Sequence, residues 1–72
     1  MTFVYSKDNC VYCVNAKMLL ESKKLPFVEV KIGVDITRDE FMEKFPNART
    51  VPQIIFEGEH IGGYDQLKAR LA

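Results

Sequence analysis

The sequence predicts an α/β protein with the element order β-α-β-α-β-β-α, in which three helices flank a mixed four-stranded sheet. Two observations predict this fold class. Segments rich in β-branched and aromatic residues alternate with segments in which apolar residues recur at helical spacing, which favours parallel pairing of the first two strands. Only a short turn separates the last two strand-like segments, as in an antiparallel hairpin. The 72 residues allow one domain, residues 1–72.

The first strand is predicted over residues 2–6, which mix β-branched and aromatic side chains, and the polar residues 7–9 end it. Over residues 11 to about 24, apolar residues recur with the period of a helix, and Pro26 ends that helix. We expect the apolar residues of this helix to face the core, Met18 among them.

The second strand is predicted over residues 27–32, which alternate with a period of two. Thr37 and Glu40 have the spacing of a capping box, so a second helix begins there, and Pro46 stops it. Two apolar side chains one turn apart give this helix its core-facing side: Phe41 and Phe45.

A hairpin and a helix close the chain. The third strand covers residues 53–56, and residues 57–59 form the turn into residues 60–61. We expect His60, in the hairpin, to be a surface residue. The last helix, over residues 65–71, has a buried face formed by Leu67 and Leu71.

Charge and hydropathy exclude several classes of function. Ten basic and ten acidic side chains give a formal net charge of zero, so no field attracts a nucleic-acid backbone or an anionic membrane. No apolar run approaches the ~18 residues of a membrane span, and the first residues become polar too soon for a secretion signal. We therefore expect a cytoplasmic monomer without nucleic-acid or membrane partners.

Cys10 and Cys13 are the only cysteines, and their C-x-x-C spacing indicates chemistry rather than structural cross-linking. A disulfide that closes so short a loop removes little entropy from the unfolded chain. At the first turn of the predicted helix, Cys10 would meet unpaired backbone N–H groups and the positive end of the helix dipole, which favour its thiolate. Lys7 adds a positive charge there, and Asp8 opposes it.

The same placement gives the two thiols different roles. A free cysteine with a pKa of ~8.5 is only a few per cent ionised at neutral pH, and each unit of lowering amounts to about 1.4 kcal/mol. Cys13 would lie one turn deeper, with its Cα near the ~5.5 Å from that of Cys10 that a disulfide prefers. We expect Cys10 to attack and Cys13 to resolve the mixed disulfide.

Two metal-based alternatives start from the same cysteines. A structural zinc site needs four Cys or His ligands, and the chain offers only His60 besides the cysteines, so we expect no metal site. A two-cysteine metal carrier is the stronger rival, because ferredoxin-like metallochaperones of similar length also place C-x-x-C between a first strand and a first helix. Their order, β-α-β-β-α-β, ends in a strand, whereas this chain is predicted to end in a helix.

Three motifs converge on one family. They are Cys10-Val11-Tyr12-Cys13 after a strand, Thr50-Val51-Pro52 before a strand, and Gly62-Gly63-Tyr64-Asp65 at the last helix. In this order and spacing the chain resembles a dithiol glutaredoxin, with a thioredoxin-like fold, over nearly its whole length and most closely over residues 50–67. Most dithiol members have proline where Val11 stands, and the Val-Tyr pair resembles some bacteriophage-encoded glutaredoxins. The Cys-Gly-Phe-Ser motif of the cluster-carrying monothiol members is absent.

The resemblance implies a glutathione-dependent thiol–disulfide oxidoreductase that reduces protein disulfides and glutathione mixed disulfides. Glutathione is then the reducing co-substrate, no cofactor is permanently bound, and ribonucleotide reductase is one protein substrate that family precedent suggests. The resemblance also implies a cis peptide bond before Pro52, which would turn the backbone N–H and C=O of Val51 toward the cysteine turn, where they could pair with an extended thiol peptide such as glutathione.

The family's glutathione contacts carry over to particular positions. Lys7 and Arg49 resemble the basic residues that receive the glycine carboxylate, while the helix start at Gly63 offers N–H groups to the other carboxylate. Asp65 would either cap the helix and accept the ammonium group at the same time, or only cap the helix. The implied contact set is Lys7, Tyr12, Arg49, Thr50, Val51, Pro52, Gly63, Tyr64 and Asp65.

One alternative lies within the oxidoreductases, namely a thioredoxin-like hydrogen donor that is reduced by thioredoxin reductase. Such redoxins have chains of similar length but a different segment before the last helix. Residues 62–65 therefore favour glutathione.

Overall fold

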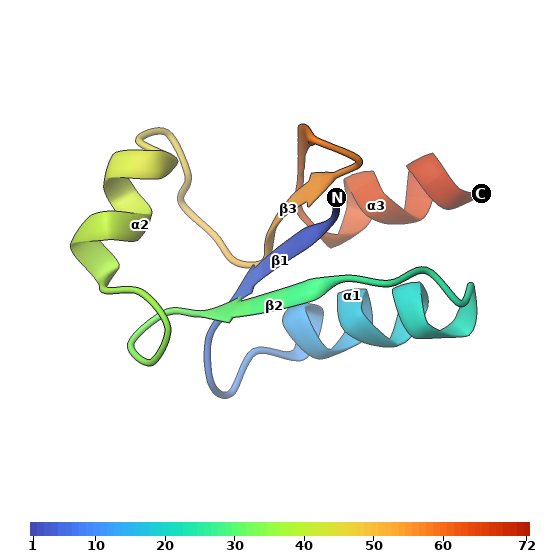
Figure 1. The fold of residues 1–72 in the computed structure, drawn as a ribbon, viewed down its shortest axis with the longest axis horizontal. Helices are drawn as coiled ribbons and strands as arrows, with labels where there is room; N and C mark the ends of the chain where they lie inside the picture. Colours follow the sequence, from blue (N-terminus) through green and yellow to red (C-terminus); the bar gives the residue numbers. More distant parts are fainter.

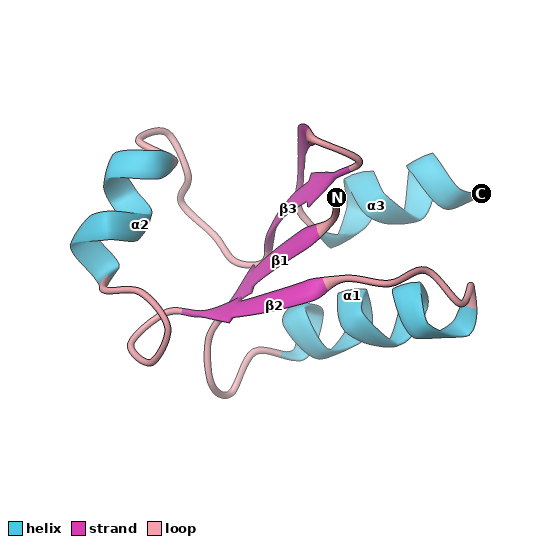
Figure 2. Ribbon diagram, viewed as in Figure 1, coloured by secondary structure: helices cyan, strands magenta, loops and turns pink.

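The computed structural model describes residues 1–72, and its elements follow the predicted order (Figures 1 and 2). The first helix ends earlier than predicted, because Lys24 adopts a left-handed backbone with φ 58°. The elements are β1 (Phe3–Ser6), α1 (Val11–Ser22), β2 (Val28–Lys31), α2 (Arg38–Lys44), β3 (Gln53–Phe56), β4 (Glu59–Gly62) and α3 (Tyr64–Leu71).

The four strands form one mixed sheet with the order β2-β1-β3-β4. β1 pairs in parallel with β2, whereas β3 runs antiparallel to both β1 and β4. The predicted parallel pairing and the predicted hairpin are thus confirmed. Because the chain ends in α3, it does not have the element order of the ferredoxin-like metal carriers.

Helices cover both faces of the sheet (Figure 1). Successive side chains of a strand point to opposite faces, so β1 contributes to two separate core clusters. On the face that α1 and α3 cover, the cluster consists of Val4, Ala16, Leu20, Ile54 and Leu67. On the face that α2 covers, it consists of Tyr5, Phe41 and Phe45.

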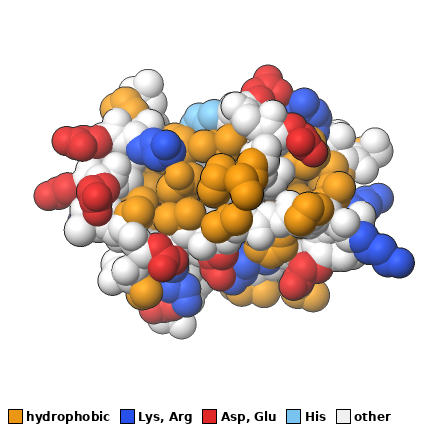
Figure 3. Space-filling view, viewed as in Figure 1, with side chains coloured by type: hydrophobic (Ala, Val, Ile, Leu, Met, Phe, Trp, Pro, Cys, Tyr) orange, Lys and Arg blue, Asp and Glu red, His pale blue; other side chains and the backbone are white.

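The surface in the view of Figure 3 shows hydrophobic side chains over the middle of the molecule, where the sheet lies, with most charged side chains around them. No helix of the chain is both long and apolar enough to cross a membrane. Leu67 is fully buried, as predicted, whereas Leu71 is only half-buried.

Met18 is 58% exposed, so the prediction that it packs in the core is wrong. Ala16 and Leu20 of the same helix are fully buried against the sheet. Met18 is two residues from each of them, which places it about 200° around the helix axis. The spacing that buries Ala16 and Leu20 therefore turns Met18 toward solvent.

The hairpin turn is tighter than predicted. Glu59 pairs with Phe56 in the ladder, so only Glu57 and Gly58 form the turn. Both turn residues have positive φ, 52° and 85°, which is the backbone that two-residue hairpin turns need. β4 consequently begins one residue earlier and ends one residue later than predicted, at Gly62.

The predicted capping box of α2 is confirmed. The N–H of Glu40 donates to Thr37 Oγ1 (3.0 Å), and the N–H of Thr37 donates to Glu40 Oε1 (2.8 Å). The bond from the Thr37 backbone, followed by its side-chain bond, lowers the pKa of the Glu40 carboxyl. This cap fixes the start of the helix whose far end leads into the loop before β3.

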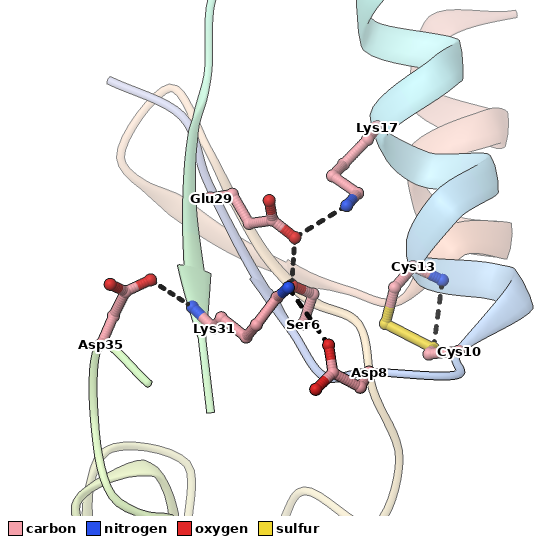
Figure 4. Close-up of polar contacts among 8 residues, drawn as sticks. All are labelled: Ser6, Asp8, Cys10, Cys13, Lys17, Glu29, Lys31 and Asp35. Atoms are coloured by element: carbon pink, nitrogen blue, oxygen red, sulfur yellow. Dashed lines mark hydrogen bonds and ion pairs between the residues drawn. A yellow bond between two sulfur atoms is a disulfide. The ribbon is translucent and has the colours of Figure 1, made fainter. Parts of the chain in front are cut away.

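A polar network ties β1 and β2 to α1 near the cysteines (Figure 4). Glu29 Oε2 accepts hydrogen bonds from Lys17 Nζ (2.7 Å) and from Oγ of the fully buried Ser6 (2.6 Å). The Lys17 bond, and after it the Ser6 bond, lowers the pKa of Glu29 below its ordinary 4.5. The carboxylate is therefore ionised at neutral pH and links the sheet to the helix.

We expect Glu29→Gln to lower the free energy of unfolding by about 1 kcal/mol at pH 7, because the amide still accepts from Ser6 but loses the ion pair with Lys17. Since the pKa of Glu29 is lowered by folding, its contribution is complete above about 4.5 and is lost as the pH falls through the folded value. Urea titrations of both proteins at pH 7 and pH 3 measure this, and their difference should shrink at pH 3.

Glu59→Gln is the matched control, because it breaks the more exposed Arg70–Glu59 pair. It should change the stability by less than about 0.5 kcal/mol. Equal losses in the two variants at pH 7 would contradict the linking role of Glu29.

Candidate active site

Cys10 caps α1 with its own side chain. Its backbone is extended (φ −118°, ψ 106°), its carbonyl accepts the N–H of Val14 (3.1 Å), and its Sγ accepts the N–H of Cys13 (3.1 Å). The sulfur thus stands where a Ser or Asp oxygen stands at many helix starts. The N–H groups of Val11 and Tyr12 have no hydrogen-bond acceptor in the chain, so this helix start favours negative charge on the sulfur.

Cys10 and Cys13 form a disulfide, and their Cα atoms lie 5.2 Å apart (Figure 4). The prediction that the two sulfurs lie within bonding reach is confirmed. Cys13 is only 1% exposed, whereas Cys10 is partly exposed. An incoming sulfur therefore meets Cys10 first, and Cys13 is placed to react with Cys10 from inside the protein.

Charged side chains near the cysteines partly offset one another. Asp8, which would oppose a thiolate, pairs with Lys31 at 3.1 Å, and this bond raises the pKa of Lys31. Lys7 forms no ion pair. Both cysteines line a hollow of about 540 Å³ whose charged residues leave one positive charge in excess: Lys7, Lys17, Lys31, Asp8 and Glu29.

The loop before β3 lies directly beside Cys10. The peptide bond between Val51 and Pro52 is cis, as the resemblance implied. The carbonyl oxygen of Val51 lies 3.7 Å from Cys10 Sγ, and the side chain of Pro52 is fully buried. A group bonded to the Cys10 sulfur would therefore lie next to the backbone of Val51.

A groove of about 730 Å³ lies next to this loop, where the end of α2, the end of β4 and the start of α3 come together. Lys7 lies outside this groove, in the hollow on which the cysteines also open. The groove collects all the other members of the predicted contact set: Tyr12, Arg49, Thr50, Val51, Pro52, Gly63, Tyr64 and Asp65.

The start of α3 differs from one prediction. The N–H of Gly63 donates to the side-chain oxygen of Gln66 (2.9 Å), and Asp65 makes no capping hydrogen bond. The expectation that Asp65 caps this helix is therefore wrong, because the acceptor three residues after Gly63 is already in place. The exposed carboxylate of Asp65 has no partner within the chain.

Sequence reasoning missed two polar residues of the groove wall, Gln53 and His60. Gln53 is 7% exposed, and its side-chain oxygen lies 2.8 Å from His60 Nε2. The ring of His60 also packs on Phe45, with centroids 4.6 Å apart. His60 is exposed, as predicted, but it is not free of contacts; the signal was a glutamine at a core-facing position of an otherwise apolar strand.

Comparisons with known proteins agree with this site. A family model described as Glutaredoxin matches residues 2–61. Glutaredoxin 3 of Escherichia coli (strain K12) is 44% identical over 66 residues, which cover 92% of this chain and 80% of that protein. These matches span most of the chain and include both cysteines, the Val51–Pro52 loop and the β3–β4 hairpin.

Solved structures give the same answer. Glutaredoxin 1 from Francisella tularensis, complexed with cacodylate, has a TM-score of 0.83 at 34% identity and covers 97% of this chain and 90% of that chain. A buckwheat glutaredoxin–glutathione complex has a TM-score of 0.75 at 28% identity and covers 97% of this chain and 66% of that chain. The mixed sheet with helices on both faces is thus the thioredoxin-like fold, whereas the likeness to bacteriophage glutaredoxins stays a prediction.

A partly exposed sulfur at a helix start, a buried sulfur in bonding contact with it and a match over most of the sequence lead to one conclusion. The chain belongs to the glutaredoxin family, and it is a thiol–disulfide oxidoreductase that works through Cys10 and Cys13.

Proposed function

We propose that the protein takes its electrons from glutathione and reduces both protein disulfides and glutathione mixed disulfides. The observation that carries this proposal is the groove beside Cys10, which gathers eight of the nine residues that the family resemblance assigns to glutathione. Support also comes from the buckwheat glutaredoxin, whose structure is a complex with glutathione.

Glutathione fits the chemistry of this groove. The N–H of Val51 has no partner in the chain, so Val51 can pair through both backbone groups with an extended thiol peptide, as an added strand does. The free N–H groups at the start of α3 suit one carboxylate, and the unpartnered Asp65 suits the ammonium group. Arg49 suits the remaining carboxylate, and Lys7, outside the groove, acts through its charge near Cys10.

In the proposed reaction, the Cys10 thiolate attacks the glutathione sulfur of a mixed disulfide and releases the substrate thiol. A second glutathione thiolate attacks the Cys10-bound glutathione, which forms glutathione disulfide and returns the Cys10 thiolate. With a protein disulfide, Cys10 forms a mixed disulfide, and Cys13 then attacks Cys10 to release the reduced protein. Two glutathione molecules reduce the resulting Cys10–Cys13 disulfide.

We further propose that the chain works as a single-domain monomer in the cytoplasm, without a permanently bound cofactor and without nucleic-acid or membrane partners. Ribonucleotide reductase is among the protein substrates we propose, because family precedent suggests it.

Replacing the two cysteines separately should divide the two reactions. Cys10→Ser should abolish both, because Cys10 is the more exposed of the two cysteines and its sulfur lies 3.7 Å from the Val51 carbonyl oxygen at the groove. Cys13→Ser should keep the release of glutathione from glutathionylated peptides but lose protein-disulfide reduction, since only the second reaction needs a resolving thiol. Both are measured by NADPH oxidation with glutathione reductase; activity of Cys10→Ser in either assay would refute the assigned roles.

Asp65→Asn should raise the KM for a glutathionylated peptide about 3- to 10-fold and leave kcat nearly unchanged, because it removes a charge that binds the ligand in the ground state and the transition state alike. The variant should fold normally, since Asp65 has no partner within the chain. Asp39→Asn, on the exposed side of α2, is the control. An unchanged KM in Asp65→Asn would remove this residue from the binding site.

The source of electrons separates this proposal from a thioredoxin-like hydrogen donor. The oxidised protein should be reduced by glutathione with glutathione reductase at a rate well above that with thioredoxin reductase. Both couplings can be followed by NADPH oxidation at equal protein concentration. Faster reduction by thioredoxin reductase would overturn the assignment of glutathione.

A further inference from the structure

Gln53 is a nearly buried amide that is bonded at both ends. Its side-chain N–H donates to the carbonyl oxygen of Thr50 (2.8 Å), and its side-chain oxygen lies 2.8 Å from His60 Nε2. Because Gln53 is only 7% exposed, a lost partner would leave a polar atom without water to replace it. These two bonds form one continuous chain from β4 through β3 to the loop before the cis peptide bond.

The direction of this chain is fixed by its chemistry. A carbonyl oxygen such as that of Thr50 only accepts, so the amide nitrogen of Gln53 must face it. The oxygen of Gln53 then faces His60 and accepts in turn, which requires a proton on His60 Nε2. His60 therefore donates to Gln53, both as the neutral ring protonated at Nε2 and as the imidazolium.

Two contacts hold the donor in place. The His60 ring packs on Phe45, which is itself 6% exposed within the core cluster that α2 covers. His60 also pairs with Ile55 in the β3–β4 ladder, beside a bulge between Ile54 and Ile55. Residues two apart on a strand share a face, so His60, Ile55 and Gln53 lie on one side of the sheet.

The chain of hydrogen bonds from His60 through Gln53 ends at the backbone next to Val51, where the ligand is proposed to bind. Thr50 is joined directly to Val51, whose carbonyl oxygen lies 3.7 Å from Cys10 Sγ. Without a bond from Gln53, the Thr50 carbonyl would be free to rotate with its peptide group, and that group includes the N–H of Val51. The N–H of Val51, one of the two backbone groups proposed to pair with glutathione, is therefore oriented from β3 and β4.

We propose that Gln53 and His60 are positioning residues for substrate binding. They orient the Thr50–Val51 peptide group, and with it the N–H of Val51, through the Thr50 carbonyl. This inference rests on the proposed use of glutathione, and it adds that the affinity of the groove depends on two residues that act through the backbone. If His60 contributed only by packing, substitutions would matter only where they removed its ring. If His60 contacted the ligand directly, the effect of replacing it would not depend on Gln53.

Two substitutions of the exposed His60 separate these roles. His60→Phe keeps a ring on Phe45 but cannot donate, and His60→Gln loses the ring but keeps an N–H donor. We expect His60→Phe to raise the KM for a glutathionylated peptide about 3- to 10-fold with kcat within about twofold, while His60→Gln stays closer to the unaltered protein. Thermal unfolding by circular dichroism verifies that both variants are folded.

A double-substitution cycle with Gln53→Met tests whether the two residues act as one chain. Methionine fills a similar volume but neither donates nor accepts strongly, so Gln53→Met should raise the KM at least as much as His60→Phe. Adding His60→Phe to Gln53→Met should then raise it little further, by less than about twofold. Additive effects, or a normal KM in His60→Phe, would overturn the proposal.

A spectroscopic measurement tests these hydrogen bonds independently of the proposed substrate. Long-range ¹H–¹⁵N correlation spectra of the imidazole at pH 8 should show the ring of His60 protonated at Nε2. The Nδ1-protonated form would overturn the chain whatever the kinetics. If the unaltered protein showed no saturable turnover of glutathionylated peptide, the proposed function would fall, and the Nε2-protonated ring would still support the bonds from His60 to Thr50.

Discussion

The hydrogen bond from the Cys13 backbone to the sulfur of Cys10 is the contact on which the site depends. Through this bond the Cys10 sulfur caps α1, as a side-chain oxygen does at other helix starts. The reactive atom therefore lies at the start of the helix. The position of α1 is in turn set by Ala16 and Leu20, which pack against β1 and β3. The reactivity of the sulfur therefore follows from where a helix begins, and that follows from the core.

The rest of the site is assembled from segments far apart in the sequence. The antiparallel pairing of β1 with β3 brings the end of β1 next to the start of β3, since Tyr5 pairs with Gln53. The cysteine turn follows β1 and the Val51–Pro52 loop precedes β3, so these two pieces meet at one edge. The hairpin then returns the chain to that edge and places the start of α3 there. The groove is lined by the loop before β3 together with the ends of the helices and strands that meet there, so regular structure holds the loop on both sides.

Much of this arrangement could be predicted from the sequence, since it is encoded locally. The Thr37–Glu40 cap, the β3 boundaries and the reach between the cysteines depend on neighbours a few residues away. The predictions that failed concern which side of an element a residue faces and which residue it bonds to. Met18 is apolar but lies on the wrong side of α1, and Asp65 loses the cap to Gln66, one residue further on. The bond between Gln53 and His60 depends on the register of β3 against β4, which no local sequence pattern specifies.

The burial of Cys13 behind Cys10 has a consequence for how the protein behaves in a cell short of small thiols. A captured protein is released by a sulfur that is always present at the same close spacing, so the local concentration of that sulfur does not depend on free thiols in solution. Reduction of the Cys10–Cys13 disulfide by glutathione, as proposed above, does depend on the concentration of free thiol. With glutathione as the reductant, a protein molecule under oxidative stress would complete the exchange in progress and then stop with the Cys10–Cys13 disulfide formed, rather than remain covalently bound to its partner.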